Sequence, residues 1–235
     1  MAIPKVIYQT FRTTNVPWIT RLYRWWFLRK NKEYTYEFYD DERVDAFIRT
    51  EFSPRVYEAY KRLRIGAAKA DFFRYAILYK KGGVYLDLDA KICVRLDDYI
   101  ESDDKAILSL EKSTRIHYAQ WAMVYEAGHP FLRRTLSTIV QNIERGRFPH
   151  NIHALTGPSV YSYAIRRQLE LEPDTPHRLI GPDYEGIFDY KYFFLSKYLI
   201  YGNPRKHWRY LQERQSALAP GPQGMAISST QEEGQ

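Results

Sequence analysis

The chain contains only one cysteine, Cys93, in 235 residues. One cysteine excludes an intrachain disulfide, which is typical of proteins in a reducing compartment. The sequence also lacks any apolar run close to the roughly 18 residues that a membrane-spanning helix needs, and its N-terminus lacks the basic-then-apolar pattern of a signal peptide. Together these absences predict a cytoplasmic protein.

Acidic residues are absent from the first thirty positions. The same segment carries six basic residues: Lys5, Arg12, Arg21, Arg24, Arg29 and Lys30. The formal net charge of the whole chain is +7, with an isoelectric point near 9.3. Such a chain attracts nucleic acid, anionic lipid or a phosphate-bearing substrate, and charge alone does not choose among these partners.

Hydrophobic residues make up 45% of the chain and aromatic residues 16%, which indicates a globular body with a sizeable core. Strand-like stretches alternate with helical patterns along most of the sequence. The expected strands lie at 4–10, 34–40, 82–92, 105–110 and 120–125. The expected helices lie at 18–30, 41–49, 53–79 with a break near 66, 129–146 and from 157 onward. This alternation predicts an α/β fold with a largely parallel sheet.

We predict a single domain over residues 1–218. The last stretch, residues 219–235, is rich in Gly, Pro, Ser and Gln and is expected to be disordered.

Two carboxylates interrupt the apolar stretch "GGVYLDLDAKI" at Gly82–Ile92. If the strand continues through it, Asp87 and Asp89 project from the same face as Tyr85. Like charges that close repel unless a proton or a cation lies between them. The alternative is an ordinary strand end, where backbone N–H groups and nearby Lys or Arg side chains bind the carboxylates. Ligands bind at the carboxyl edge of open α/β sheets, so we favour a cation.

Mg²⁺ or Mn²⁺ suits a pair of carboxylates, because these ions prefer oxygen ligands and are often completed by substrate phosphates and water. The preceding helix adds Asp71 and Arg74, three residues apart on one face. That pair is either an ordinary helix salt bridge or part of the same site. The pattern therefore predicts a metal–diphosphate site.

The block "AAKADFFRYAILYKKGGVYLDLDA" resembles the signature of glycosyltransferase family 32, the DXD-containing sugar transferases. "IPKVIYQTF", "AGHPFL" and "LTGPSVY" match further landmarks of that family in the right order, and the resemblance covers roughly residues 3 to 208. It implies a GT-A fold, which is a Rossmann-like, mostly parallel sheet flanked by helices. It also implies Mn²⁺ or Mg²⁺, a nucleotide-diphosphate sugar donor and transfer with retention of configuration. A UDP-sugar is favoured over GDP-mannose, and the acceptor would be a glycan or glycolipid in surface polysaccharide synthesis.

The resemblance also assigns roles to particular residues. Asp87 would face the ribose or donor sugar and reach the metal through water, and Asp89 would bind the metal directly. Asp71 and Arg74 would hold the donor-sugar hydroxyls. Further donor-binding positions are Tyr8, Gln9, Thr10, Tyr85, Gln120 and Trp208.

Several of these positions depart from the family pattern. Tyr8 stands where a His is usual, and Gln120 stands where the family often has Asn. Gln120 is equally explained as a polar residue at the start of a strand. His207 is a candidate third metal ligand, although a His beside Trp208 can simply pack against it, and Tyr201 occupies the usual His position.

Two other functions compete with a transferase. A phosphatase of the haloacid dehalogenase type also uses D-x-D after an apolar strand, but here the motif continues with Ala90-Lys91 and lies far from the N-terminus. A basic protein that binds nucleic acid or an anionic surface fits the charge but leaves Asp87 and Asp89 unexplained. The family resemblance implies no nucleic-acid partner.

The segment 18–30, "WITRLYRWWFLRK", has two readings. Ile19, Leu22, Tyr23 and Trp26 have the spacing of an inner helix face packed on the sheet. The remaining aromatic residues lie beside cations, which suits the headgroup layer of an anionic membrane. The second reading places the protein peripherally at the inner face of the cell membrane.

Overall fold

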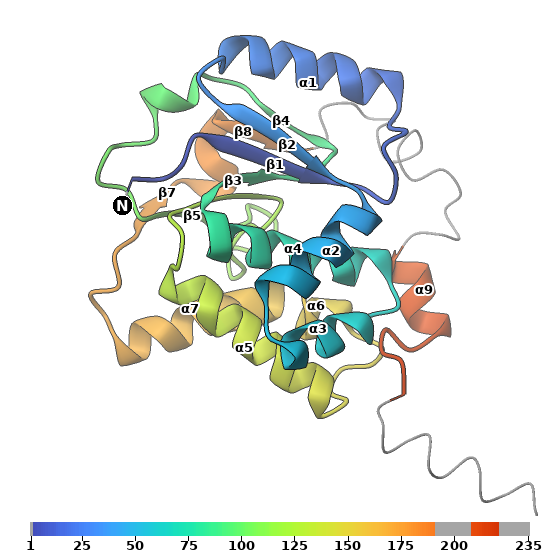
Figure 1. Cartoon of the computed structure of the whole chain (residues 1–235). Coiled ribbons are helices and arrows are strands. Elements are labelled where there is room, and N and C mark those ends of the chain that lie inside the picture. The colour runs from blue at the N-terminus through green and yellow to red at the C-terminus, as the bar shows by residue number, and fades with distance from the viewer. Residues whose placement is uncertain (1, 191–207, 221–235) are drawn as a thin grey trace, which may run out of the picture.

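The computed structural model describes residues 2–190 and 208–220 of the chain (Figure 1). Six strands form a central sheet in the order β2-β1-β3-β6-β5-β7. They are β1 (Val6–Thr10), β2 (Thr35–Tyr39), β3 (Gly83–Leu86), β5 (Ala106–Ser109), β6 (Ala122–Tyr125) and β7 (Arg178–Ile180). A second, two-stranded sheet pairs β4 (Ala90–Ile92) with β8 (Phe188–Tyr190).

The central sheet is mostly parallel. Strand β1 runs parallel to β2 and β3, and β5 runs parallel to β7. Strand β6 lies between β3 and β5 and is antiparallel to both. The predicted α/β fold is therefore confirmed, with one reversed strand that the sequence pattern did not indicate.

Helices cover both faces of the sheet. They are α1 (Trp18–Lys30), α2 (Asp41–Glu51), α3 (Pro54–Lys61), α4 (Gly66–Lys81), α5 (Pro130–Glu144), α6 (Ile152–Leu155), α7 (Pro158–Leu171) and α9 (Trp208–Arg214), with 3-10 segments η1 (Leu96–Asp98) and η2 (Pro182–Gly186). Figure 1 shows α1 on one side of the sheet and α2 to α7 on the other. The predicted break between α3 and α4 is confirmed at residues 62–65.

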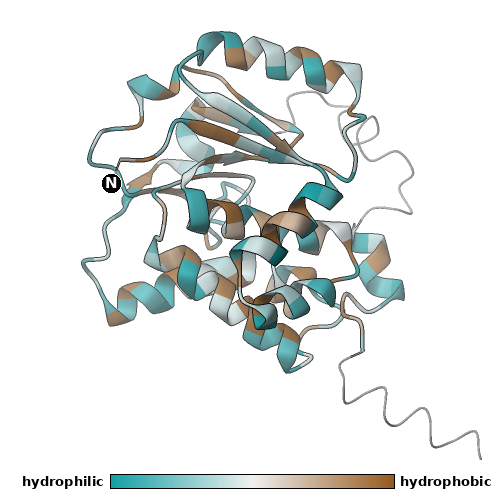
Figure 2. Ribbon diagram, viewed as in Figure 1, coloured by the Kyte–Doolittle hydropathy of each residue, from teal (hydrophilic) through white to brown (hydrophobic). Residues whose placement is uncertain are grey.

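Strand alternation divides the core into two clusters. Tyr8 and Tyr85 face the large cluster under α2 to α7, whereas Ile7 and Val84 face a smaller one under α1. Helix α4 is central to the large cluster, because an unbroken buried run covers most of its second half. Figure 2 shows apolar residues on its ribbon. Side chains on α4 near the carboxyl edge of β3 are therefore buried by the fold itself.

The structure corrects the predicted strand at 82–92. Strand β3 ends at Leu86, and the Ala90 N–H donates to the Asp87 carbonyl at 3.0 Å, which closes a turn over Asp87–Ala90. The Asp87 N–H donates to the Trp121 carbonyl at 2.7 Å. Asp87 thus follows the strand directly, while Asp89 lies in the turn and does not share a strand face with it.

The link from α4 to β3 requires glycine. Gly82 and Gly83 both have positive φ, +65° and +107°. A Cβ on Gly83 would lie 2.7 Å from the Val6 carbonyl oxygen, so β1 and this turn approach more closely than a side chain allows. The helix ends at this glycine pair as the sequence predicts. The C-cap Gly82 has a positive φ, but its ψ of −173° lies outside the left-handed helical region that was expected.

We expect Gly83→Ala to lower the free energy of unfolding by about 3 kcal/mol or more, because positive-φ strain costs about 1–3 kcal/mol and the added Cβ would also lie 2.7 Å from the Val6 carbonyl oxygen. Gly128→Ala is the matched control: its φ is also positive, +77°, but nothing lies within 4 Å of the added Cβ. Urea unfolding of both variants measures the difference. Equal losses would show that the close approach to Val6 contributes nothing.

Helix α1 turns a different face inward from the one expected. Its buried residues are Thr20 and Phe27, whereas Leu22 is 50% exposed and Trp26 is 39% exposed. The predicted inner face was wrong for Leu22 and Trp26, whereas its other two residues, Ile19 and Tyr23, are half-buried. No helix in the described ranges is long and apolar enough to cross a bilayer.

The end of the predicted domain is hydrogen-bonded to the body. The Ala219 N–H donates to the Arg62 carbonyl at 2.8 Å, and the Ala219 carbonyl accepts from Arg62 Nε. Residue 219 therefore belongs with the body and not with the predicted tail. The rest of that tail, residues 221–235, lies outside the described residues.

Candidate active site

Helix α4 carries the two charged residues of the candidate site on its buried face. Asp71 and Arg74 are each about 5% exposed, and one guanidinium nitrogen of Arg74 lies 3.3 Å from Asp71 Oδ1. The same nitrogen lies 3.0 Å from Asp87 Oδ1. Arg74 therefore joins a helix carboxylate to the carboxylate at the end of β3. The simple salt-bridge reading of Asp71 and Arg74 does not account for this third member.

The tyrosine on β3 completes the contacts of Asp87. The Tyr85 hydroxyl donates to Asp87 Oδ1 at 3.0 Å, and the Arg74 guanidinium lies 4.9 Å from the centre of the Tyr85 ring. The Tyr85 hydrogen bond and the Arg74 ion pair both fall on Oδ1 of Asp87, and within the described ranges its Oδ2 makes no hydrogen bond or ion pair. Arg74 Nε is buried and likewise makes no hydrogen bond there. The cluster thus retains an acceptor and a donor for a ligand.

Gln120 and Thr156 hold the other side of Asp71. The Gln120 amide donates to Asp71 Oδ1 at 3.0 Å and accepts from the Tyr75 hydroxyl. The Thr156 hydroxyl donates to Asp71 Oδ2 at 3.0 Å, and the Gln120 carbonyl accepts from Arg74 at 2.7 Å. Gln120 therefore lies in the cluster as predicted. Its side chain supports Asp71.

The electrostatics of the cluster follow from its burial. Burial raises the pKa of Asp71 from 3.8 to about 6, although the Arg74 cation and the Thr156 hydroxyl act to lower it. Burial also raises the pKa of Asp87, against the lowering effects of Arg74 and the Tyr85 hydrogen bond. One cation thus serves two desolvated carboxylates. A further positive charge at the Asp87 end would be stabilised there.

The second aspartate of the pair is close to that end. Asp89 is 4% exposed and lies two residues after Asp87 in the Asp87–Ala90 turn. In the described ranges no group of three or more His, Cys, Asp or Glu side chains gathers at one point. Two carboxylates offer hard oxygen ligands but leave most positions of a divalent ion open. This donor set fits Mg²⁺ or Mn²⁺ completed by phosphate and water better than a closed structural metal site.

The opening strand supports this turn from the sheet. Gln9 is 1% exposed, and its amide nitrogen donates to the Asp87 carbonyl at 3.1 Å. Its amide oxygen accepts from the Tyr36 hydroxyl at 3.0 Å, and Tyr36 in turn accepts from Arg24 at 3.1 Å. A hydrogen-bond chain therefore connects α1 to the backbone of the Asp87 turn.

The neighbours of Gln9 have other contacts. Tyr8 is 1% exposed and packs in the large cluster, with its ring centre 6.3 Å from that of Tyr39. The Thr10 hydroxyl donates to the Tyr39 carbonyl at 2.8 Å. Nucleotide contacts of Tyr8, Gln9 and Thr10 stay predictions. In this structure the side chain of Tyr8 is core, and those of Gln9 and Thr10 brace the backbone.

Trp208 lies at the start of α9, next to the segment that carries Thr156. Its ring centre is 5.9 Å from that of His153 on α6, three residues before Thr156. This brings the C-terminal helix close to the segment that carries Thr156. His207, the predicted third metal ligand, lies outside the described residues.

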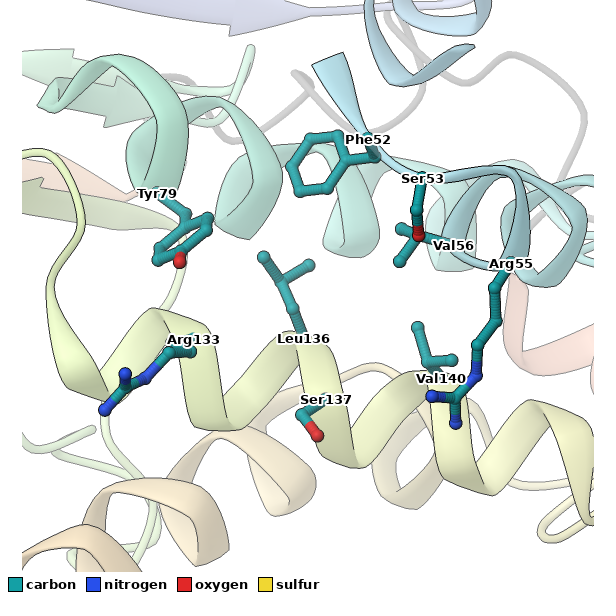
Figure 3. Close-up of a pocket in the computed structure, with 9 residues that line it drawn as sticks. All are labelled: Phe52, Ser53, Arg55, Val56, Tyr79, Arg133, Leu136, Ser137 and Val140. Atoms are coloured by element: carbon teal, nitrogen blue, oxygen red, sulfur yellow. The ribbon is translucent and has the colours of Figure 1, made fainter. Parts of the chain in front are cut away.

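A cavity of about 230 Å³ lies between α3, α4 and α5, and Figure 3 shows the side chains that line it. Its lining includes Phe52, Val56 and Leu136, with Arg55 and Arg133 at its sides. None of the predicted site residues lines it. We therefore assign the site to the Asp71–Arg74–Asp87 cluster.

Two members of the cluster were missed from sequence. Tyr75 follows Arg74 directly and looks like any core aromatic residue of α4. Thr156 lies within "LTGPSVY", which was noted as a landmark without a role. Thr156 reaches Asp71 across 85 residues of sequence, so only the packing of α6 against α4 could identify it.

The chain is similar in sequence to known glycosyltransferases. Residues 11–106 match the family described as the glycosyltransferase sugar-binding region containing the DXD motif. An initiation-specific alpha-1,6-mannosyltransferase of Schizosaccharomyces pombe is 24% identical over 190 residues, covering 69% of this chain and 48% of that protein. Inositol phosphoceramide mannosyltransferase 3 of the same organism is 30% identical over 172 residues, covering 66% of this chain and 41% of that protein. The chain thus spans less than half the length of either relative.

A solved structure shows the same architecture. The UDP-bound glycosyltransferase domain of the YGT toxin aligns with a TM-score of 0.58 and 9% identity, covering 84% of this chain and 82% of that one. The fold is therefore that of the GT-A glycosyltransferases. The family-model match, the mannosyltransferase relatives and this fold together support a DXD-containing glycosyltransferase of the family 32 type.

Proposed function

We propose that this protein transfers a hexosyl group from a nucleotide-diphosphate sugar to a hydroxyl group of a glycan or glycolipid, with retention of configuration. The observation that carries the proposal is the buried Asp71–Arg74–Asp87 cluster at the carboxyl edge of β3, next to Asp89 in its turn. A carboxylate and a guanidinium fork recognise sugar hydroxyls, and two further carboxylates recognise a cation that carries a diphosphate.

Each residue has a defined task in this proposal. Asp71 accepts hydrogen bonds from donor-sugar hydroxyls, and Arg74 keeps both Asp71 and Asp87 charged and oriented. The acceptor oxygen forms a bond to the anomeric carbon as the bond from that carbon to the diphosphate oxygen breaks. The acceptor proton passes to the departing diphosphate, so no enzymic nucleophile is required.

Asp87 and Asp89 would hold a divalent cation, Mn²⁺ or Mg²⁺. Bound there, it would act as a Lewis acid that balances the charge on the leaving diphosphate. His207 remains the proposed third protein ligand, and Trp208 is proposed to cover the diphosphate.

The proposed donor is a UDP-sugar, with GDP-mannose as the alternative. The UDP-bound state of the YGT toxin domain supports the first, and the mannosyltransferase names of the two yeast relatives support the second. One relative is named for inositol phosphoceramide, which supports a lipid-linked acceptor. We propose surface polysaccharide synthesis in the cytoplasm as the setting.

A panel of nucleotide sugars incubated with Mn²⁺ tests the proposal. Release of nucleoside diphosphate and a thermal shift should both single out one donor. If no member of the panel is turned over and none stabilises the protein, the assignment of the donor site is wrong.

A basic binding protein without catalysis predicts different behaviour. In the transferase, the double substitution Asp87→Asn with Asp89→Asn should abolish turnover. In a protein that only binds nucleic acid or another polyanion, the same change should leave binding intact or tighten it.

Thr156 should act as a positioning residue for Asp71. We expect Thr156→Val to lower kcat about tenfold with little change in KM, because a hydrogen bond to a charged group contributes about 1.5–3 kcal/mol. Thr156→Ser keeps the hydroxyl and should restore most of the activity. If Ser and Val behave alike in steady-state kinetics, the hydroxyl has no such role.

A further inference from the structure

The outward face of α1 is its most aromatic face. Trp18, Leu22, Trp25 and Trp26 are 66%, 50%, 55% and 39% exposed. They recur at intervals of three, four and seven residues, which places them on one stripe of the helix. Helices of soluble domains normally present polar residues there. The exposure of this apolar stripe therefore calls for an explanation, and a binding partner would provide one.

Cations accompany the aromatic stripe. The Arg29 guanidinium lies 4.9 Å from the Trp25 ring centre, and the Lys30 ammonium lies 4.0 Å from that of Trp26. Arg21 is exposed on the flank of the stripe, and no acidic residue occurs in the helix. Exposed indole rings beside Arg and Lys side chains offer apolar contact and positive charge on one surface.

The opposite face of α1 is anchored, so the stripe cannot turn inward. Phe27 is 1% exposed in the smaller core cluster. Asn31, directly after the helix, donates to the Phe27 and Val94 carbonyls at 3.0 Å and accepts from the Leu96 N–H at 2.7 Å. The position of α1, apart from the other helices, is visible in Figure 1.

We propose that the outer face of α1 docks on an anionic lipid bilayer. Trp18, Trp25 and Trp26 would lie at the headgroup level, where amphipathic rings are favoured, and the Arg and Lys side chains would meet lipid phosphates. Charge complementarity selects this occupant over a second copy of the chain. In a symmetric dimer through this face, α1, which carries four cations and no acid, would pack against an identical helix. The like charges would then repel each other.

This surface is separate from the donor site but connected to it. Arg24 leaves the stripe and begins the hydrogen-bond chain through Tyr36 and Gln9 to the Asp87 carbonyl. Docking would therefore hold this edge of the sheet near the membrane. For the transferase proposed above, it would also bring the donor site near a lipid-linked acceptor. Arg24 has to stay unchanged in any test of binding alone.

The test is flotation with vesicles of phosphatidylcholine, alone or mixed with phosphatidylglycerol, in the absence of donor. We expect binding to the mixed vesicles only, weakened by salt, and quenching of tryptophan fluorescence by brominated lipid. Trp18→Ser with Trp25→Ser, and separately Arg21→Glu with Arg29→Glu, should each reduce binding at least tenfold.

The control variant is Arg145→Glu with Arg147→Glu, an equal charge change at exposed positions after α5. It should bind as the unaltered protein does. Absence of binding, or equal losses in the control, would overturn the proposal. So would a mass doubling in solution that is lost in the tryptophan variant, which would assign the face to a second copy. Stabilisation by nucleoside diphosphate with Mn²⁺ reports the donor site independently, so each proposal can fail without the other.

Discussion

Replacing Asp89 with Asn should abolish the stabilisation that UDP or GDP gives in the presence of Mn²⁺. A ligand at about 100 times its Kd stabilises a protein by about 2.7 kcal/mol, which corresponds to roughly 5–10 °C in Tm for a domain of this size. Two carboxylates need a cation between them and the diphosphate, so losing one removes most of that gain. Thermal unfolding with nucleotide, in Mn²⁺ and in EDTA, measures it.

The control for this experiment is Asp174→Asn, which changes an exposed acidic residue in the turn after α7. It should keep the full metal-dependent shift. Asp89→Asn should melt close to the unaltered protein when no ligand is added. If the nucleotide shift survives both EDTA and Asp89→Asn, the metal–diphosphate site does not exist at this turn.

Changing Asp71 to Asn should lower turnover tenfold or more, which corresponds to about 1.4 kcal/mol of transition-state stabilisation. Affinity for the free nucleoside diphosphate should change little, because Asp71 contacts Arg74, Gln120 and Thr156 on the side of the cluster assigned to the sugar. Asn retains the shape and can still accept from Gln120. Steady-state kinetics together with titration of UDP separates the two effects.

For Arg74 a conservative substitution is needed. Removing one partner of a buried ion pair destabilises by about 3–5 kcal/mol, and Arg74→Ala would leave both Asp71 and Asp87 without their cation. Arg74→Lys keeps the charge but loses the planar fork, so we expect a folded protein with at least tenfold lower turnover. Equal losses of UDP and UDP-sugar binding in both variants would make the pair structural.

The alternation of strand-like and helical patterns along the sequence was enough to predict the α/β fold class. Proline and glycine positions were also reliable, because Pro130, Pro158 and the Gly82–Gly83 pair act through their own backbone restrictions and need no partner. The antiparallel direction of β6 could not be predicted from the sequence pattern. A strand buried on both faces has the same composition in either direction.

The corrections to the strand at 82–92 and to the inner face of α1 have a common physical cause. Asp89 alternates correctly for a strand, yet the Asp87–Ala90 turn ends β3 because the chain must leave the central sheet to pair β4 with β8. Leu22 and Trp26 have the right spacing for an inner face, yet α1 rests on Thr20 and Phe27. Periodicity gives the spacing of residues on an element, and the neighbouring elements decide which face is covered.

By itself, the sequence determined that Asp71 and Arg74 share a helix face and that Asp87 lies at the end of an apolar strand, because those relations are local. It also carried the family resemblance in one continuous block of about two dozen residues. Only the tertiary structure decided that Arg74 binds both carboxylates, that Thr156 holds Asp71, and that Gln9 supports the turn. The Thr156–Asp71 and Gln9–Asp87 contacts join residues 85 and 78 positions apart. They exist because α6 packs against α4 and because β1 lies beside β3 in the sheet.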